Sequence, residues 1–476
     1  MSVLPAPGEG HPPAEESEQE SSAHGVSLSD AFRVWGYVAL NSFGGPAGQI
    51  AVMHRVLVDG RRWISERRFL HALNYCMLLP GPEAHQLAVY IGWLLHGIRG
   101  GLMAGLLFIL PGFLSILALS VLYAGYQETT LVAAFFYGIK PAVLAIVAAA
   151  VVRVGRRALP NRTLVAIAIS AFVATFFLDI PFPLIILGAA TIGLLGARLA
   201  PLTFGGGPGP GPADVDDGAD AAVRHVLRDD AKGGPRPPLR RAAAILAVGM
   251  VVWLGPVVAV AALFGGQSIF VQESLFFSGA ALITFGGAYA VLAYIAQEVV
   301  ESLAWLTPDE MLDGLGMAET TPGPLIMVVQ FVGFLAAFRS PGDLDPMLAG
   351  VLGAILVTWV TFVPATLWIF LGAPYIEYLR GKRALTGALS AITATVVGVI
   401  ANLGLWFSLH TLFGVVDQAR AGPLRLYVPD PATLDFAALA IAIFALVAIF
   451  RLRWPILATI AVSALAGTVY HLAILS

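Results

Sequence analysis

Two short motifs, each present twice, are the parts of this sequence best suited to chemistry. Phe43-Gly44-Gly45 recurs as Phe285-Gly286-Gly287, and Pro80-Gly81-Pro82 recurs as Pro322-Gly323-Pro324, each at an offset of 242 residues. A glycine turn followed by proline favours the start of a helix, because proline suits the first helical position. A helix start offers unpaired backbone N–H donors and about half a positive charge, and these bind oxyanions. Four such starts that meet would form an oxyanion-binding site.

Polar side chains extend this hypothesis. Lys140 stands in an otherwise apolar run, where a charge is costly and often marks a transport pathway. Its ammonium would add a full positive charge, which suits a divalent anion; the alternative is a lysine that reaches a nearby interface. Hydroxyl and amide groups beside the motifs are further donors, although such groups also bond to carbonyls of their own helix. The predicted substrate-binding residues are Asn41, Ser42, Gly44, Gly45, Gly81, Glu83, Lys140, Thr284, Gly286, Gly287, Thr320, Thr321 and Gly323.

Two acids lie next to the Pro-Gly-Pro motifs. Glu83 follows the first motif and Glu319 precedes the second. An acid at a helix start commonly stabilises that start. The alternative is an acid that titrates and exchanges protons against the anion. Glu319 is the leading candidate for proton coupling and Glu83 is the second.

Other kinds of site find little support. The single cysteine, Cys76, cannot form an internal disulfide, and no pattern typical of a metal site, nucleotide site or hydrolase is present. The net charge of −3 gives no basic surface for nucleic acid. We therefore predict no catalytic residue, no metal, no cofactor and no nucleic-acid partner. A membrane-embedded enzyme is a distant alternative, since it would need clustered His, Asp or Cys.

The composition places these motifs in a lipid bilayer. Of 476 residues, 58% are hydrophobic and 12% are charged, against about 25% charged in soluble proteins. Apolar runs such as 101–123, 131–152, 242–264 and 437–450 are typical of membrane-spanning helices. The predicted fold class is therefore an all-α polytopic membrane protein.

The repeated motifs divide the chain into two homologous halves. We predict a disordered acidic tail at 1–28, a first repeat at 29–200, a flexible Gly/Pro-rich cytoplasmic linker at 201–239, and a second repeat at 240–476. Trp63 and Trp305 are a further matching pair at the same offset.

Charges in equivalent loops predict that the halves face opposite ways. Short cytoplasmic loops collect Lys and Arg. The loop after the first motif is rich in arginine, whereas its counterpart is acidic and has no Lys or Arg. All basic loops lie inside if the motif segments are re-entrant hairpins, with spans near 101–125, 128–152, 163–178, 182–200 and 241–264. This is an inverted-topology repeat with broken helices, a plan used by secondary transporters; kinked continuous spans are the alternative. The contrasting loop residues are Arg55, Arg61, Arg62, Arg67 and Arg68 against Glu298, Glu301, Asp309, Glu310 and Asp313.

Over about residues 29 to 410 the sequence resembles the long-chain, two-half chromate ion transporters. The resemblance implies a transporter in the bacterial inner membrane that exports chromate, a tetrahedral dianion, and confers chromate resistance. Sulfate or another oxyanion is the alternative cargo, and the sequence leaves proton antiport, voltage-driven transport and a homodimer all open. Ala288 departs from the proline found at Pro46. The matching motifs are Phe43-Gly44-Gly45-Pro46, Arg62-Trp63-Ile64-Ser65-Glu66, Leu79-Pro80-Gly81-Pro82-Glu83, Phe285-Gly286-Gly287, Trp305-Leu306-Thr307 and Ala318-Glu319-Thr320-Thr321-Pro322-Gly323-Pro324.

Overall fold

The chain folds almost entirely into helices, several of them long and apolar enough to cross a membrane. The computed structural model describes residues 26–126, 129–204, 239–285, 287–373 and 383–475, so the predicted tail and linker lie almost wholly outside the described residues. Within these ranges seven helices have the length and composition of membrane spans. They are α5 (Glu83–Tyr126), α6 (Thr130–Ala158), α8 (Phe182–Leu199), α11 (Leu239–Phe264), α16 (Pro346–Gly372), α18 (Arg383–Leu412), and α20 (Ile456–Tyr470) with its continuation η7 (His471–Leu475).

Large apolar side chains on these helices point outward. Leu106 and Leu187 are each 62% exposed, and Val251 is 71% exposed. Such exposure costs free energy in water but not in lipid. The prediction of a polytopic α-helical membrane protein is therefore confirmed.

Helices break at all four motif positions. Gly81 and Gly323 have φ values of 133° and 106°, which residues with a side chain rarely adopt. These glycines let one helix stop and the next begin within a few residues. In chain order the elements on either side of the breaks are α2 (Leu28–Leu40) and α3 (Gly45–His54); α4 (Glu66–Cys76) and α5; α12 (Ile269–Leu282) and α13 (Ala288–Gln297); and α14 (Pro308–Thr320) and the 3-10 turn η4 (Leu325–Met327), which leads into α15 (Val328–Arg339).

The element α5 consists of two antiparallel arms. His96 and Gly97 have non-helical backbone angles, and the chain reverses there. A Cβ atom on Gly92 would lie 2.4 Å from the carbonyl oxygen of Gly100, and one on Gly105 would lie 2.7 Å from the Val89 side chain. The first arm, 83–95, therefore packs closely against the second arm, 98–126, and only the second arm has the length of a membrane span.

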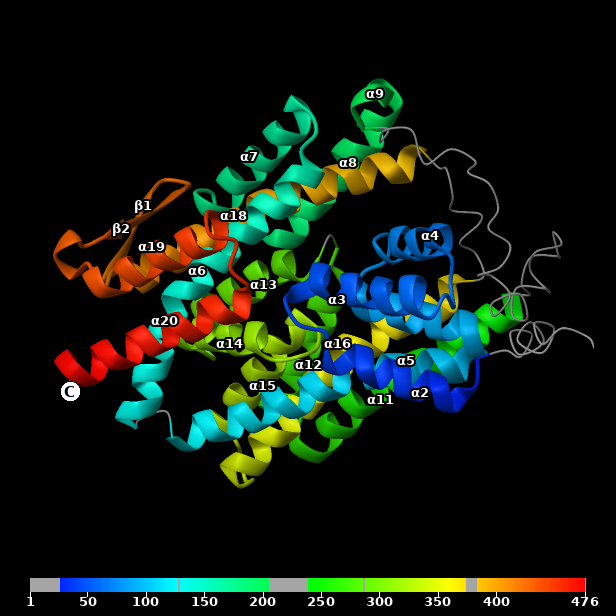
Figure 1. Cartoon of the computed structure of the whole chain (residues 1–476), viewed down its shortest axis with the longest axis horizontal. Helices are drawn as coiled ribbons and strands as arrows, with labels where there is room; N and C mark the ends of the chain where they lie inside the picture. The colour runs from blue at the N-terminus through cyan, green and yellow to red at the C-terminus, as the bar shows by residue number, and fades with distance from the viewer. Residues whose placement is uncertain (1–25, 127–128, 205–238, 286, 374–382, 476) are drawn as a thin grey trace, which may run out of the picture.

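One two-stranded hairpin departs from the all-α prediction. β1 (Val416–Ala421) pairs with β2 (Leu424–Pro429) in antiparallel register. Charged residues such as Asp417 and Arg420 interrupt this segment, so it is too polar to extend α18 through lipid. In Figure 1 the hairpin lies at the same end of the molecule as the C-terminus, and α2 and α4 lie toward the opposite end. The remaining elements are α7 (Arg162–Phe176), α9 (Pro201–Phe204), α19 (Phe436–Phe450), the π-helices η2 (Arg55–Gly60) and η3 (Glu298–Ser302), and the 3-10 turn η6 (Pro431–Thr433).

Candidate functional site

Each Pro-Gly-Pro turn is hydrogen-bonded to the other half of the chain. The backbone N–H of Gly81 donates to the carbonyl of Thr284 at 2.8 Å, and the N–H of Gly323 donates to the carbonyl of Ser42 at 2.9 Å. The two donors are counterparts at the 242-residue offset, and so are the two acceptors. The breaks in one half are therefore fixed in position by the breaks in the other.

Long helices press on the same two glycines. A Cβ atom on Gly323 would lie 3.1 Å from the Cα atom of Gly112 in α5, and one on Gly81 would lie 2.8 Å from the Cβ atom of Ala365 in α16. Gly112 and Ala365 are also counterparts, one residue after Pro111 and Pro364. Neither turn has room for a side chain, so the close packing of a long helix against each turn requires glycine.

The four breaks surround one small pocket. It lies at the starts of α3, α5 and α13 and at the turn η4 that precedes α15. The structure thus brings together the four predicted helix starts. The pocket-lining residues are Pro46, Gln49, Pro82, Glu83, Ala84, Ala288, Pro324, Leu325 and Ile326.

Two of the helix starts at this pocket have no side-chain cap among the described residues. Within the described chain, Gly44 and Gly287 precede α3 and α13 without any side chain that caps the helix start. Gln49 and Gln86 instead bond to the carbonyls of Gly323 and Pro80, so their amides hold the turns. Helix starts that lack a side-chain cap have N–H groups available for a ligand.

The predicted hydroxyl and amide donors are used within their own helices. Ser42 Oγ donates to the carbonyl of Val38 at 2.6 Å, and its counterpart Thr284 Oγ1 donates to that of Ala280 at 2.7 Å. These groups satisfy carbonyls at helix ends, so they stabilise the breaks and do not point donors at the pocket. Asn41, Thr320 and Thr321 bond in the same way to carbonyls three or four residues earlier, and Gly286 lies outside the described residues.

One predicted acid, Glu83, lines the pocket, and the other, Glu319, is connected to it through Tyr289. Glu83 lines the pocket at the start of α5. Glu319 is 3% exposed and accepts a 2.6 Å hydrogen bond from the Tyr289 hydroxyl through Oε1, while its Oε2 has no hydrogen-bond partner among the described residues. Tyr289 follows the pocket residue Ala288, and a Cβ on Gly45 would lie 3.6 Å from its hydroxyl. Arg153 on α6 lies within electrostatic reach of both Tyr289 and Glu319.

Lys140 corrects one expectation. Its Nζ lies 3.2 Å from Asp309 and 3.8 Å from Asp313, both on α14, and Asp313 also accepts a 2.8 Å hydrogen bond from Tyr123. Lys140 is not among the residues that line the pocket. Two carboxylates already neutralise its ammonium, so it does not offer a free charge to an anion at the helix starts. The sequence shows a charge in an apolar run but not which acids pack against it.

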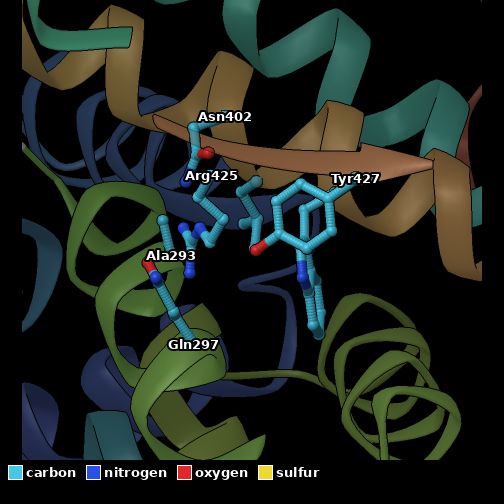
Figure 2. Close-up of a pocket in the computed structure, with 7 residues that line it drawn as sticks. Ala293, Gln297, Asn402, Arg425 and Tyr427 are labelled. Carbon is cyan, nitrogen blue, oxygen red and sulfur yellow. The ribbon is translucent and has the colours of Figure 1, made fainter. Parts of the chain in front are cut away.

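A second polar cluster was not predicted from the sequence. Figure 2 shows Arg425 and Tyr427 of β2 facing Gln297 of α13 and Asn402 of α18 across a small pocket, whose lining also includes Ala293, Leu403 and Trp406. Arg425 is 3% exposed and its guanidinium lies 2.8 Å from Glu301 and 2.9 Å from Asp179. These partners are far apart in the sequence and follow no motif. Among the described residues no group of His, Cys, Asp and Glu is arranged to hold a metal ion.

Comparisons with known proteins agree with one another. The family model for the chromate transporter matches residues 29–194 and 271–468. A chromate transport protein of Pseudomonas aeruginosa is 32% identical over 370 residues, which is 76% of each chain. A probable chromate transport protein of Synechococcus elongatus is 28% identical over 411 residues, 84% of this chain and 92% of its own. A chromate transport protein of Cupriavidus metallidurans is 27% identical over 358 residues, 75% of this chain and 77% of its own. No solved structure matches the chain significantly.

Proposed function

The chain belongs to the chromate transporter family, and from that premise we propose that it is a secondary transporter that exports chromate across the bacterial inner membrane and so confers chromate resistance. Relatives over most of the chain are named chromate transport proteins, which supports an oxyanion substrate and a transporter rather than an enzyme. Seven membrane-length helices support passage through the bilayer.

The observation that carries the proposal is the pocket shared by all four helix breaks. Chromate has four oxygens that accept hydrogen bonds and none that donate. Helix starts that converge on one point supply N–H donors and partial positive charge from several directions. Apolar residues such as Ala288 and Ile326 form most of the remaining wall, which also includes Gln49 and Glu83, and the low dielectric beside the apolar residues strengthens these interactions. A dianion is thus held by backbone dipoles and not by a free lysine.

We assign the halves opposite orientations in the membrane. The exchanged hydrogen bonds of Gly81 and Gly323 support a two-fold relation between the halves. Arg55, Arg61 and Arg67 are exposed in the first half's loop, and arginines in short loops favour the cytoplasm. We therefore place this loop in the cytoplasm and its acidic counterpart at 298–313 on the outer face. The α7–α8 loop and the hairpin β1–β2 then lie on the outer face as well.

The membrane potential is sufficient to drive this export. Each negative charge that leaves a cell with a negative interior releases about 2.3 kcal/mol of free energy per 100 mV, so export of a dianion releases about 5 kcal/mol at 100 mV. Proton exchange at Glu319 is thus an addition to the driving force and not a requirement. Sulfate has the same charge and shape as chromate, and backbone donors would serve both, so sulfate is the second candidate cargo.

A pair of glycine substitutions tests the pocket. Gly81→Ala places a Cβ 2.8 Å from Ala365 and from the amide of Gln86, at a φ of 133°. Gly342→Ala is the matched control, because Gly342 also has a positive φ, of 61°, but has open space around it. We would measure the flux of labelled chromate in everted vesicles with equal amounts of each variant. We expect the flux of Gly81→Ala to be at least about tenfold lower than that of the wild type, and the flux of Gly342→Ala to be close to it. Equal flux in the two variants would show that the pocket is not part of the transport path.

A further inference from the structure

The two halves share a structural detail at the C-terminal ends of α3 and α13, the helices that follow the Phe-Gly-Gly breaks. α3 runs into the π-helix η2 and α13 runs into the π-helix η3. The N–H of Arg61 donates to the carbonyl of Val56 at 2.8 Å, and the counterpart pair, Leu303 and Glu298, forms the same bond at 2.8 Å. π-helices are rare and often lie at functional positions.

Each π-helix carries an acid at the same counterpart position, Asp59 in η2 and Glu301 in η3, but the two acids are held very differently. The Asp59 side chain is 61% exposed and lies 3.3 Å from the Nδ1 atom of His54. The Glu301 side chain is 18% exposed and accepts from four donors: Trp406 at 2.9 Å, Tyr427 at 2.8 Å, Arg425 at 2.8 Å and Gln297 at 3.3 Å. One acid is loosely held at the cytoplasmic face, and the other is tightly held at the outer face.

The bonds of Glu301 tie α13 to the rest of the outer face. Trp406 belongs to α18, and Arg425 and Tyr427 belong to β2. Arg425 also pairs with Asp179 of the α7–α8 loop at 2.9 Å, and its guanidinium donates to the carbonyl of Thr175 at 3.2 Å. Glu301, Arg425, Asp179, Trp406 and Tyr427 together are called the outer clamp, and Figure 2 shows two of them, Arg425 and Tyr427.

We propose that the outer clamp is the outer gate of the transporter, and that the bonds of Glu301 must open before an anion can leave the central pocket. This inference rests on the proposed function. Ala288 at the start of α13 lines the central pocket, while Ala293 and Gln297 further along the same helix line the pocket beside the clamp. A ten-residue helix is a rigid rod of about 15 Å, so the clamp and the central pocket cannot move independently.

The chemistry of the clamp gives it two discrete states. Pulling Glu301 away from Arg425 leaves buried charges without partners, which is strongly unfavourable unless water enters. The clamp is thus either closed and dry or open and hydrated, as a gate requires. The structure has the closed arrangement at the outer face, while the counterpart acid Asp59 has no comparable set of bonds in the described chain.

Accessibility of the central pocket tests the gate without any substrate. A cysteine at Ala288, in a Cys76→Ala background, would be labelled from the outer face by a membrane-impermeant thiol reagent. We expect slow labelling when the clamp is intact and at least about tenfold faster labelling in Arg425→Ala, because loss of a buried charge partner shifts the population toward the open state. Arg420→Ala is the matched control: Arg420 pairs with the same Asp179 at 3.3 Å, but its side chain is 70% exposed, so labelling should stay within about twofold of the unmodified clamp.

Tyr427→Phe keeps the proposal testable if Arg425→Ala does not fold, because it removes one donor to Glu301 and keeps the ring. It should also speed outer labelling. A second measurement locks the gate. Cysteines at Ala293 and Leu403 would be joined through disulfide bonds by a short bis-methanethiosulfonate cross-linker. The cross-link should stop both labelling from the outer face and chromate flux, and reduction of the disulfides should restore both. Outer labelling that neither the variants nor the lock changes would overturn the gate. If the variants alter labelling while no vesicle transports chromate, the gate stands and the proposed substrate is wrong.

Discussion

The hydroxyl of Tyr289 donates a 2.6 Å hydrogen bond to Oε1 of Glu319, next to the pocket where the four helix starts meet. Tyr289 belongs to α13 and Glu319 to α14, so the bond joins the two breaks of the second half. A carboxylate here repels an incoming dianion, whereas a protonated carboxyl does not. We therefore expect the charge state of Glu319 to be coupled to occupation of the pocket.

Glu319→Gln should uncouple flux from protons. The amide keeps an oxygen that accepts from Tyr289 but carries no charge. We expect anion binding to persist and any dependence of chromate flux on a pH gradient to disappear, as measured in everted vesicles. Glu298→Gln, a change in the acidic segment at 298–313, is the control and should keep the wild-type dependence. Loss of binding in Glu319→Gln would show instead that the acid holds the site together.

Removal of the Lys140 ammonium should destabilise the protein through Asp313, whose side chain is 5% exposed. Lys140→Met leaves that carboxylate without its cation, at a cost of about 3 kcal/mol, the low end for a broken buried pair. Thermal unfolding in detergent should show a lower midpoint for Lys140→Met and recovery in the double variant with Asp313→Asn. A double variant that is stable yet inactive would show that Lys140 takes part in transport after all.

Glu273→Met should stabilise the fold. Glu273 in α12 is fully buried, and neither carboxyl oxygen has a hydrogen-bond partner in the part of the chain that the structure describes. An apolar side chain of similar length removes this unfavourable burial, which is worth about 1–3 kcal/mol. We expect a higher unfolding midpoint and unchanged flux. A stable variant without flux would mean that the carboxyl itself takes part in transport.

Cysteine labelling should reveal the opposite orientation of the halves. Ser65 and Thr307 are counterparts at the 242-residue offset, and each begins a helix by accepting from a backbone N–H three residues on. Single cysteines at these positions, in a Cys76→Ala background, should react with an impermeant reagent from opposite faces of the membrane. Reaction of both from one face would exclude the inverted repeat.

The sequence predicted the helix breaks well because local chemistry determines them. Gly81 and Gly323 adopt backbone angles that favour glycine, and proline beside them marks the next helix start, so the motifs alone locate the turns. The meeting of the four starts followed from the repeat. The partners of charged side chains did not follow, because they depend on how distant helices pack.

Lys140 and Arg425 show this limit most clearly. The acids that pair with Lys140 are on α14, about 170 residues away, and those of Arg425 are in the α7–α8 loop and η3. No local pattern encodes such contacts. The donors expected from Ser42 and Thr284 also proved to be used within their helices, an outcome that depends on side-chain rotamers and not on residue type.

Movement of chromate itself tests the central claim most directly. Everted inner-membrane vesicles that contain the protein would be given labelled chromate and a lumen-positive potential, which corresponds to export from the cell. The account predicts that chromate accumulates in these vesicles, faster as the potential rises, and that Gly81→Ala vesicles accumulate it at least about tenfold more slowly. Accumulation no greater than in vesicles without the protein would contradict it.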